Sequence, residues 1–78
     1  MSKIIDKIIS GRPDNNIDFS DLRKALSDLG FQERIKGSHH IFYKADVAEI
    51  VNIQPVGNKA KQYQVKQIRN LLIKYKLL

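Results

Sequence analysis

The chain has 78 residues, too few for a second domain or a deep enclosed active site, so we expect one domain with a shallow site. It contains no cysteine, which excludes a disulfide framework and a thiolate metal site. No apolar run approaches the ~20 residues of a membrane span, and the first residues do not resemble a signal peptide, so a cytoplasmic protein is expected.

The formal net charge is +6, and the positive charge is concentrated in the second part of the chain. Residues 1–30 carry five basic and five acidic side chains, whereas residues 31–78 carry nine basic and three acidic ones. No carboxylate side chain follows Glu49. A one-sided basic half is typical of proteins that bind polyanions such as nucleic acids, although solubility alone also accounts for it.

Two helices are expected before residue 31. The first is short, is capped by Ser2 and ends at Gly11, and its paired isoleucines share one side. A turn-rich connector, GRPDNN, follows it. Asp18 is expected to cap the second helix, which stops at Gly30 in the left-handed conformation that glycine adopts readily. Its apolar residues recur at the i, i+3, i+4, i+7 spacing of a buried stripe: Leu22, Ala25, Leu26 and Leu29.

Three short strands are expected next, because the apolar period changes from helical to alternating. They are FQERIK (31–36), HHIFYK (39–44) and EIVNIQ (49–54). A Gly-Ser pair at 37–38 marks the first turn, KADVA reads as a loose second turn, and Pro55 ends the third strand. Alternation in the third strand places Val51 and Ile53 on one face and Asn52 on the other.

Helical spacing returns at the end of the chain, where six residues share one broad face: Tyr63, Val65, Ile68, Leu71, Leu72 and Tyr75. Gln64 and Lys66 are expected outside this face. The element order is therefore (α)α-β-β-β-α, and the short connections favour an antiparallel sheet. We expect a two-layer α+β domain, with helices on one face of a three-stranded sheet and the other face open.

The segment KGSHHIFYK, residues 36–44, holds both histidines of the chain. Alternation puts His39 and Tyr43 on one face of the strand, and His40 and Phe42 on the other, where Phe42 is expected in the core. Adjacent histidines on opposite faces are poorly placed to chelate one ion, so no metal and no cofactor are expected. A single imidazole acting in acid–base chemistry is the better chemical interpretation, and a histidine that only bonds a turn carbonyl is the alternative.

The segment resembles the Gly-Ser-His-x-x-Phe/Tyr signature of HicA toxins, the mRNA-cleaving half of HicA–HicB toxin–antitoxin pairs. Gly37, Ser38, His39 and Phe42 occupy the matching positions. The resemblance covers residues 17–78, through a helix ending in Leu-x-x-x-Gly-Phe, a basic strand, a third strand, a basic loop and a closing helix. Residues 1–16 resemble the helical extension and connector of longer members, so the whole chain is interpreted as a single HicA-like domain.

The resemblance implies a double-stranded-RNA-binding-domain-like fold, a metal-independent endoribonuclease activity on mRNA, and inhibition by a HicB-type antitoxin protein. It assigns the general base to His39, the residue directly after Gly-Ser. Because the next residue, His40, is also a histidine, the assignment between the two must be tested. Family members often carry a second histidine after the third strand, where this chain has Gln54. A two-histidine pair is therefore available only through His40. The free toxin is expected to be a monomer.

Seven further residues are expected to contact RNA: Gly37, Ser38, Lys36, Lys44, Tyr43, Lys59 and Lys61. Gly37 would allow a close backbone approach, and Ser38 would orient the imidazole or donate to a phosphate oxygen, with turn formation as its alternative. The lysines would contact phosphates. Tyr43 would stack a base or bond the imidazole, with core packing as its alternative. A non-catalytic RNA-binding module of the same fold is the alternative to a ribonuclease.

Overall fold

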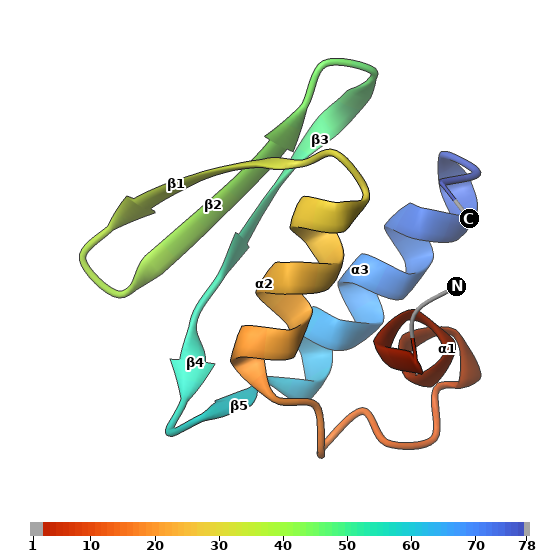
Figure 1. Ribbon diagram of the computed structural model, residues 1–78, viewed down its shortest axis with the longest axis vertical. Coiled ribbons are helices and arrows are strands. Elements are labelled where there is room, and N and C mark those ends of the chain that lie inside the picture. Colours follow the sequence, from red (N-terminus) through yellow and green to blue (C-terminus); the bar gives the residue numbers. More distant parts are fainter. Residues whose placement is uncertain (1–2, 78) are drawn as a thin grey trace.

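The computed structural model describes residues 3–77 and contains, within them, three helices and two small sheets (Figure 1). The helices are α1 (Lys3–Ser10), α2 (Phe19–Asp28) and α3 (Gln62–Lys74). The strands are β1 (Gln32–Lys36), β2 (His39–Lys44), β3 (Val47–Ile53), β4 (Pro55–Val56) and β5 (Lys59–Ala60). This arrangement confirms the expected α+β class and the expected order of the main elements.

The main sheet has the strand order β1-β2-β3, and both neighbouring pairs are antiparallel. Its buried face carries Phe42, Val51 and Ile53, which belong to one core with the apolar stripes of α2 and α3. Figure 1 shows α2 and α3 side by side on the same side of this sheet. The opposite face, which includes Ile50 and Asn52, is exposed. The sheet is therefore covered on one face and open on the other, as expected.

The N-terminal segment packs into the same core. Ile5 and Ile8 of α1 are buried, and α1 contacts both α2 and α3. Nη1 of Arg69 in α3 donates to both carboxylate oxygens of Asp14, at 2.9 and 3.0 Å, and to the carbonyl of Ile8 at 3.2 Å. Ser2, which was expected to cap α1, lies outside the described residues. Within residues 3–77 no helix has the length and apolar character needed to span a membrane.

Two helix ends follow the sequence signals in different ways. Gly30 has a φ of +96°, so the left-handed stop of α2 is confirmed. Asp18 occupies the N-cap position of α2, but its side chain makes no capping hydrogen bond. Its Oδ1 instead accepts from Nζ of Lys59 at 2.6 Å. Asp18 therefore ties the start of α2 to β5 rather than to the backbone of its own helix.

Four expectations about the second half of the chain were wrong in detail. β3 begins at Val47, two residues earlier than expected, and the segment after Ile53 forms the β4–β5 hairpin rather than a loop. Tyr63, expected on the buried face of α3, is 64% exposed, whereas Gln64, expected outside it, is only 3% exposed. Gln64 is tolerated there because its Oε1 accepts the backbone N–H of Gln54 at 3.2 Å.

Candidate active site on the open face of the sheet

A tight turn places His39 at the start of β2. Lys36 and His39 are paired across β1 and β2, so only Gly37 and Ser38 connect the two strands. Gly37 has a φ of +60°, and two-residue hairpin turns with positive φ at the first central position strongly favour glycine. The glycine is therefore explained by turn geometry, and the turn presents His39 beside Lys36 on the open face.

Both ring nitrogens of His39 contact side-chain amides from the end of β3 and the residue that follows it. Nδ1 lies 3.2 Å from Oδ1 of Asn52, and Nε2 lies 3.0 Å from Nε2 of Gln54. The same Gln54 amide nitrogen is 3.3 Å from Oγ of Ser38. Nζ of Lys61, the N-cap residue of α3, donates to Oε1 of Gln54 at 3.3 Å. These contacts join the turn, β3 and the start of α3 into one polar network.

The network borders a shallow pocket of about 220 Å³. Its lining residues are His39, Asn52, Gln54, Tyr63 and Gln64. The ring of His39 is exposed, and the tyrosine ring lies with its centroid 6.0 Å from Nζ of Lys61. A small polar pocket with an exposed imidazole, an amide, a nearby ammonium group and an aromatic ring offers the groups needed to bind a phosphate and a base.

His40 has different surroundings, because it points to the helical side of the sheet. Its Nδ1 lies 2.8 Å from Oε2 of Glu33, and its ring meets the ring of Phe19 edge-on, with centroids 4.8 Å apart. Arg23 donates to both oxygens of the same carboxylate, at 2.7 and 3.0 Å. This arginine, and to a smaller extent His40, lowers the pKa of Glu33. The side chain of His40 is only 13% exposed and lies on the other face from His39, so the two imidazoles do not form a pair.

Other residues expected to contact RNA lie at different distances from this pocket. Lys36 is the cross-strand neighbour of His39, and Lys61 reaches it through Gln54. Lys59 is ion-paired with Asp18, but it borders a neighbouring apolar pocket that also includes Lys61 and Tyr63.

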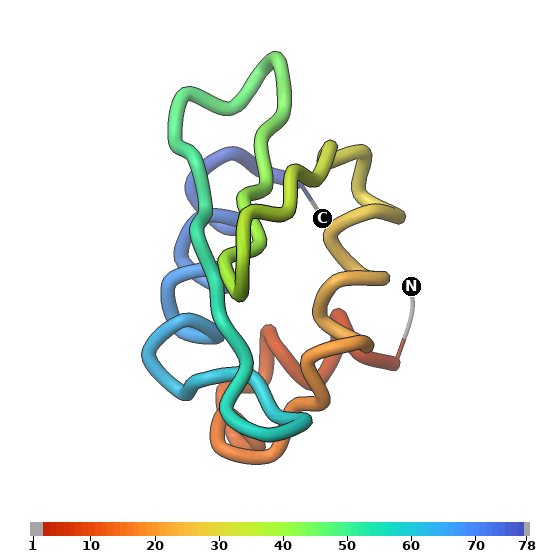
Figure 2. Tube along the Cα trace, turned by 90° about the vertical axis from the view of Figure 1, so that its left-hand side faces the viewer, coloured from red at the N-terminus to blue at the C-terminus, as the bar shows by residue number. Residues whose placement is uncertain are grey.

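Lys44 and Tyr43 lie toward the far end of β2. Nζ of Lys44 donates to Asp46 at 2.7 Å, and this carboxylate has a lowered pKa chiefly because of that bond. Tyr43 is on the same face as His39 but lines a separate pocket of about 270 Å³ with Arg34, Ile41 and Ile50. Figure 2 shows the β2–β3 turn at the top of the molecule, well away from the β1–β2 turn. The structure therefore does not bring these two residues to the imidazole.

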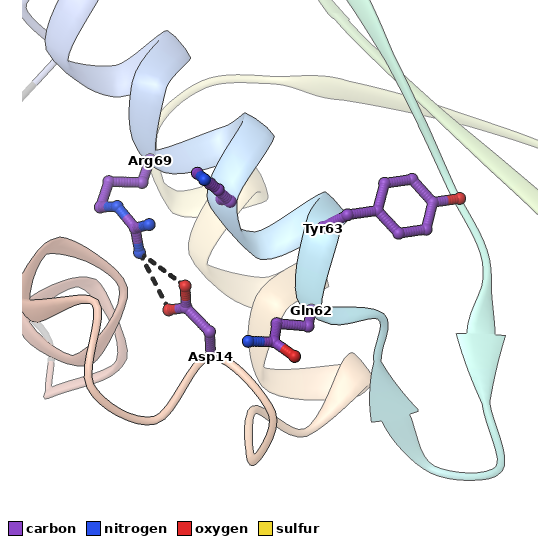
Figure 3. Close-up of a pocket in the computed structure, with 5 residues that line it drawn as sticks. Asp14, Gln62, Tyr63 and Arg69 are labelled. Carbon is purple, nitrogen blue, oxygen red and sulfur yellow. Dashed lines mark hydrogen bonds and ion pairs between the residues drawn. The ribbon is translucent and has the colours of Figure 1, made fainter.

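Another pocket, of about 480 Å³, lies beside this site, between α3 and the connector that follows α1 (Figure 3). It is lined by Asp14, Gln62, Tyr63, Lys66 and Arg69. Figure 3 shows Tyr63 extending from the start of α3 away from the Asp14–Arg69 ion pair. Because Asp14 neutralises Arg69, Lys66 is the cation of this pocket with no ion-pair partner among the described residues.

Sequence reasoning missed three residues of the His39 pocket as functional candidates: Asn52, Gln54 and Tyr63. Because Asn52 alternates with Val51, the sequence did place Asn52 on the open face. The local sequence does not predict the register between β2 and β3, and this register brings Asn52 to His39. Within residues 3–77 no three His, Cys, Asp or Glu side chains lie close enough together to hold a metal ion.

Comparison with known families gives one match. The family model for the HicA toxin of bacterial toxin–antitoxin systems matches residues 19–75, well over half of the chain. The matched range begins at the first residue of α2 and includes every residue that lines the His39 pocket. No curated protein and no solved structure matches the chain significantly.

Proposed function

Because this chain belongs to the HicA toxin family of bacterial toxin–antitoxin systems, we propose that it is an endoribonuclease that cleaves mRNA with His39 as the general base. The observation that carries the proposal is the position of His39: its ring is exposed on the open sheet face, between Lys36 and the Gln54–Lys61 contact. In that position the imidazole is accessible to a long RNA chain, which could not enter an enclosed cavity.

RNA supplies its own nucleophile, the ribose 2′-hydroxyl, and DNA lacks this group. Neutral His39 takes the hydroxyl proton as the 2′-oxygen forms a bond to the adjacent phosphorus. The bond from phosphorus to the 5′-oxygen of the next nucleotide breaks, and that oxygen takes a proton from water. The products are a 2′,3′-cyclic phosphate and a 5′-hydroxyl, and the imidazolium returns its proton to solvent. General base catalysis of this kind contributes roughly 10²–10⁴-fold.

Charge that develops on the phosphate oxygens needs donors already in place. The hydroxyl of Ser38, the amide of Gln54 and the ammonium group of Lys61 are joined in one network at the imidazole, so they are the nearest donors for this role. The exposed ring of Tyr63 offers a flat surface on which a neighbouring base stacks.

We also propose that the partner of this toxin is a HicB-type antitoxin that covers the open sheet face. That face carries an apolar pocket of about 270 Å³ beyond the His39 site, lined by Arg34, Ile41, Tyr43 and Ile50. A net charge of +6 favours fast, electrostatically steered association with an acidic partner. A protein that binds to this face would cover His39 and would also exclude RNA from the site.

The test is the His39→Ala variant compared with wild type. Induced wild type should arrest growth and degrade mRNA, whereas purified His39→Ala should cleave about 10²–10⁴-fold more slowly and still bind RNA. His40→Gln is the control, because glutamine can still donate to Glu33 and the open face is unchanged. Equal cleavage by wild type and His39→Ala would remove His39 from the mechanism. Wild type that binds RNA without cutting it would favour a non-catalytic RNA-binding module.

A further inference from the structure

An imidazole accepts a proton only through the ring nitrogen that carries none, so a histidine base must have the correct tautomer. The hydrogen bond at one ring nitrogen determines which nitrogen stays free. His39 has a different amide partner at each ring nitrogen. The chemistry of these two partners identifies the nitrogen that is available.

At Nδ1 the partner is an oxygen. Oδ1 of Asn52 can only accept, so a hydrogen bond at 3.2 Å requires the ring proton to be on Nδ1 of His39. Asn52 lies in β3, and its backbone is fixed by the pairing with Ile41 in β2. The acceptor is therefore presented by a strand of the sheet and not by a mobile loop.

At Nε2 the partner is a donor. The ammonium group of Lys61 can only donate, so it requires the oxygen of the Gln54 amide to face Lys61. The NH₂ group of Gln54 then faces Nε2 of His39 at 3.0 Å and Oγ of Ser38 at 3.3 Å. An N–H donor at Nε2 requires a lone pair there. The backbone N–H of Gln54 is held by buried Gln64, which fixes where this side chain begins.

We propose that Asn52 and Gln54 are positioning residues for His39. Asn52 holds the ring proton on Nδ1, and Gln54, oriented by Lys61, keeps Nε2 unprotonated and covers it until the 2′-hydroxyl of RNA replaces the amide. Lys36 lies across the hairpin from the ring, and Lys61 lies behind Gln54. No carboxylate in the part of the chain that the structure describes is hydrogen-bonded to His39. The proposal deepens the proposed function, because it rests on His39 being the base.

The direct test is ¹⁵N NMR of the histidine rings in the full chain, in mildly alkaline solution without RNA. Wild type should show Nδ1 of His39 protonated and Nε2 unprotonated. Asn52→Ala should move His39 toward the Nε2–H tautomer that isolated neutral histidine prefers, and Asn52→Asp, which keeps the acceptor oxygen, should restore the wild-type signals. The signals of His40 are the internal control, because that ring is bonded to Glu33 on the other face. A wild-type His39 ring protonated on Nε2 would overturn the proposal. A ring unchanged in Asn52→Ala would refute the role of Asn52, because Gln54 alone would then be sufficient to keep Nε2 unprotonated.

Gln54 is tested by an almost isosteric change. Gln54→Glu replaces the donor by a carboxylate, which should draw a proton onto Nε2, so both ring nitrogens of His39 should give protonated signals near neutral pH. Gln67→Glu adds the same charge to an exposed position of α3 and should leave the ring unchanged. Identical His39 signals in wild type and Gln54→Glu would show that Gln54 does not control this nitrogen.

Cleavage assays separate the positioning role from the proposed function. Asn52→Ala should lower kcat by about 10–100-fold with little change in KM, and Asn52→Asp should recover most of the loss. Asn70→Ala, an exposed change on α3, should cleave as wild type does. Wild type with the expected ring signals but no cleavage would refute the ribonuclease and leave the ring assignment standing. Full cleavage by Asn52→Ala would refute the positioning role and leave the ribonuclease standing.

Discussion

His39 and His40 are adjacent residues with different chemistry. His39 is exposed, and both its ring nitrogens contact uncharged amides. His40 contacts the carboxylate of Glu33 and the ring of Phe19, so it fastens the sheet to α2. Strand alternation sends the two side chains to opposite faces. A substitution at His40 should therefore lower the free energy of unfolding, whereas a substitution at His39 should lower the rate of RNA cleavage.

The ring of Tyr63 is expected to stack against a base of bound RNA. This residue is 64% exposed at the edge of the His39 pocket, so removing its ring should cost little stability. Tyr63→Ala should weaken binding of single-stranded RNA by about 1–3 kcal/mol, roughly 5- to 150-fold, through loss of base stacking. Fluorescence anisotropy in a His39→Ala background measures binding without cleavage.

Two further variants control this experiment. Tyr63→Phe keeps the aromatic face and should bind RNA nearly as well as the parent. Ile73→Ala removes a similarly exposed side chain, 57% exposed, from the other end of α3 and should have no effect. Unchanged affinity of Tyr63→Ala would mean that RNA does not stack at this position.

At the scale of elements, β1 depends on side-chain contacts for its attachment to the helices. All five of its residues are exposed, and it lies at the edge of the sheet. The bidentate bond from Arg23 to Glu33, with His40 on the same carboxylate, joins β1 and β2 to α2. Charged residues on an edge strand also discourage pairing with another chain. This cluster therefore holds the hairpin that carries His39 in place.

The Glu33 cluster predicts a dependence of stability on pH. Arg23 and then His40 lower the pKa of Glu33 below 4.5, so the stabilisation is present above that value and is lost as pH falls through the lower folded-state pKa. Glu33→Gln should reduce the free energy of unfolding near neutral pH by roughly 1 kcal/mol, because the pair is partly exposed. The difference from wild type should shrink as pH falls below 4.5, as urea denaturation at several pH values would measure.

Asp28→Asn is the matched control for this prediction. Asp28 forms an exposed ion pair with Lys24 within α2, and exposed pairs of this kind contribute little. Its loss should leave both the unfolding free energy and its pH dependence nearly unchanged. Equal stability of Glu33→Gln and wild type at neutral pH would contradict the role given to this cluster.

At the scale of the whole molecule, folding redistributes the charge that the sequence separates. Carboxylates from earlier parts of the chain neutralise three cations of the last 20 residues, in the pairs Asp14–Arg69, Asp18–Lys59 and Glu49–Lys74. Lys36, Lys61 and Lys66 have no ion-pair partner among residues 3–77. These three cations lie at the His39 pocket or beside it. Three of the cations that have no ion-pair partner are therefore grouped around the site.

This distribution predicts which lysines contribute to the salt dependence of RNA binding. Lys66→Gln should reduce the slope of log Kd against log salt concentration by roughly 0.7–1, because one phosphate contact and its released counterion are lost. Lys74→Gln, on the same helix, should change the slope less, because Glu49 already pairs with that ammonium group and raises its pKa. Binding titrations at several salt concentrations in the His39→Ala background provide the measurement. Equal slope changes would mean that RNA contacts are spread along the whole helix.

The sequence alone was sufficient for the features that depend on local backbone geometry. Helical and alternating periods gave α2, the three main strands and α3, and the positive φ of Gly30 followed from its place after an apolar stripe. Alternation also separated His39 from His40, because successive side chains of a strand must point to opposite faces. The family match over residues 19–75 confirms the resemblance to HicA toxins.

Contacts between distant segments required the tertiary structure. The register of β3 against β2 brings Asn52 and Gln54 to His39, and the start of α3 adds Lys61 and exposes Tyr63. The periodicity of one segment predicts which face of that segment a residue occupies, but it does not predict which other segment the residue contacts. Packing of the whole core sets that register, and so it also sets which groups surround the imidazole.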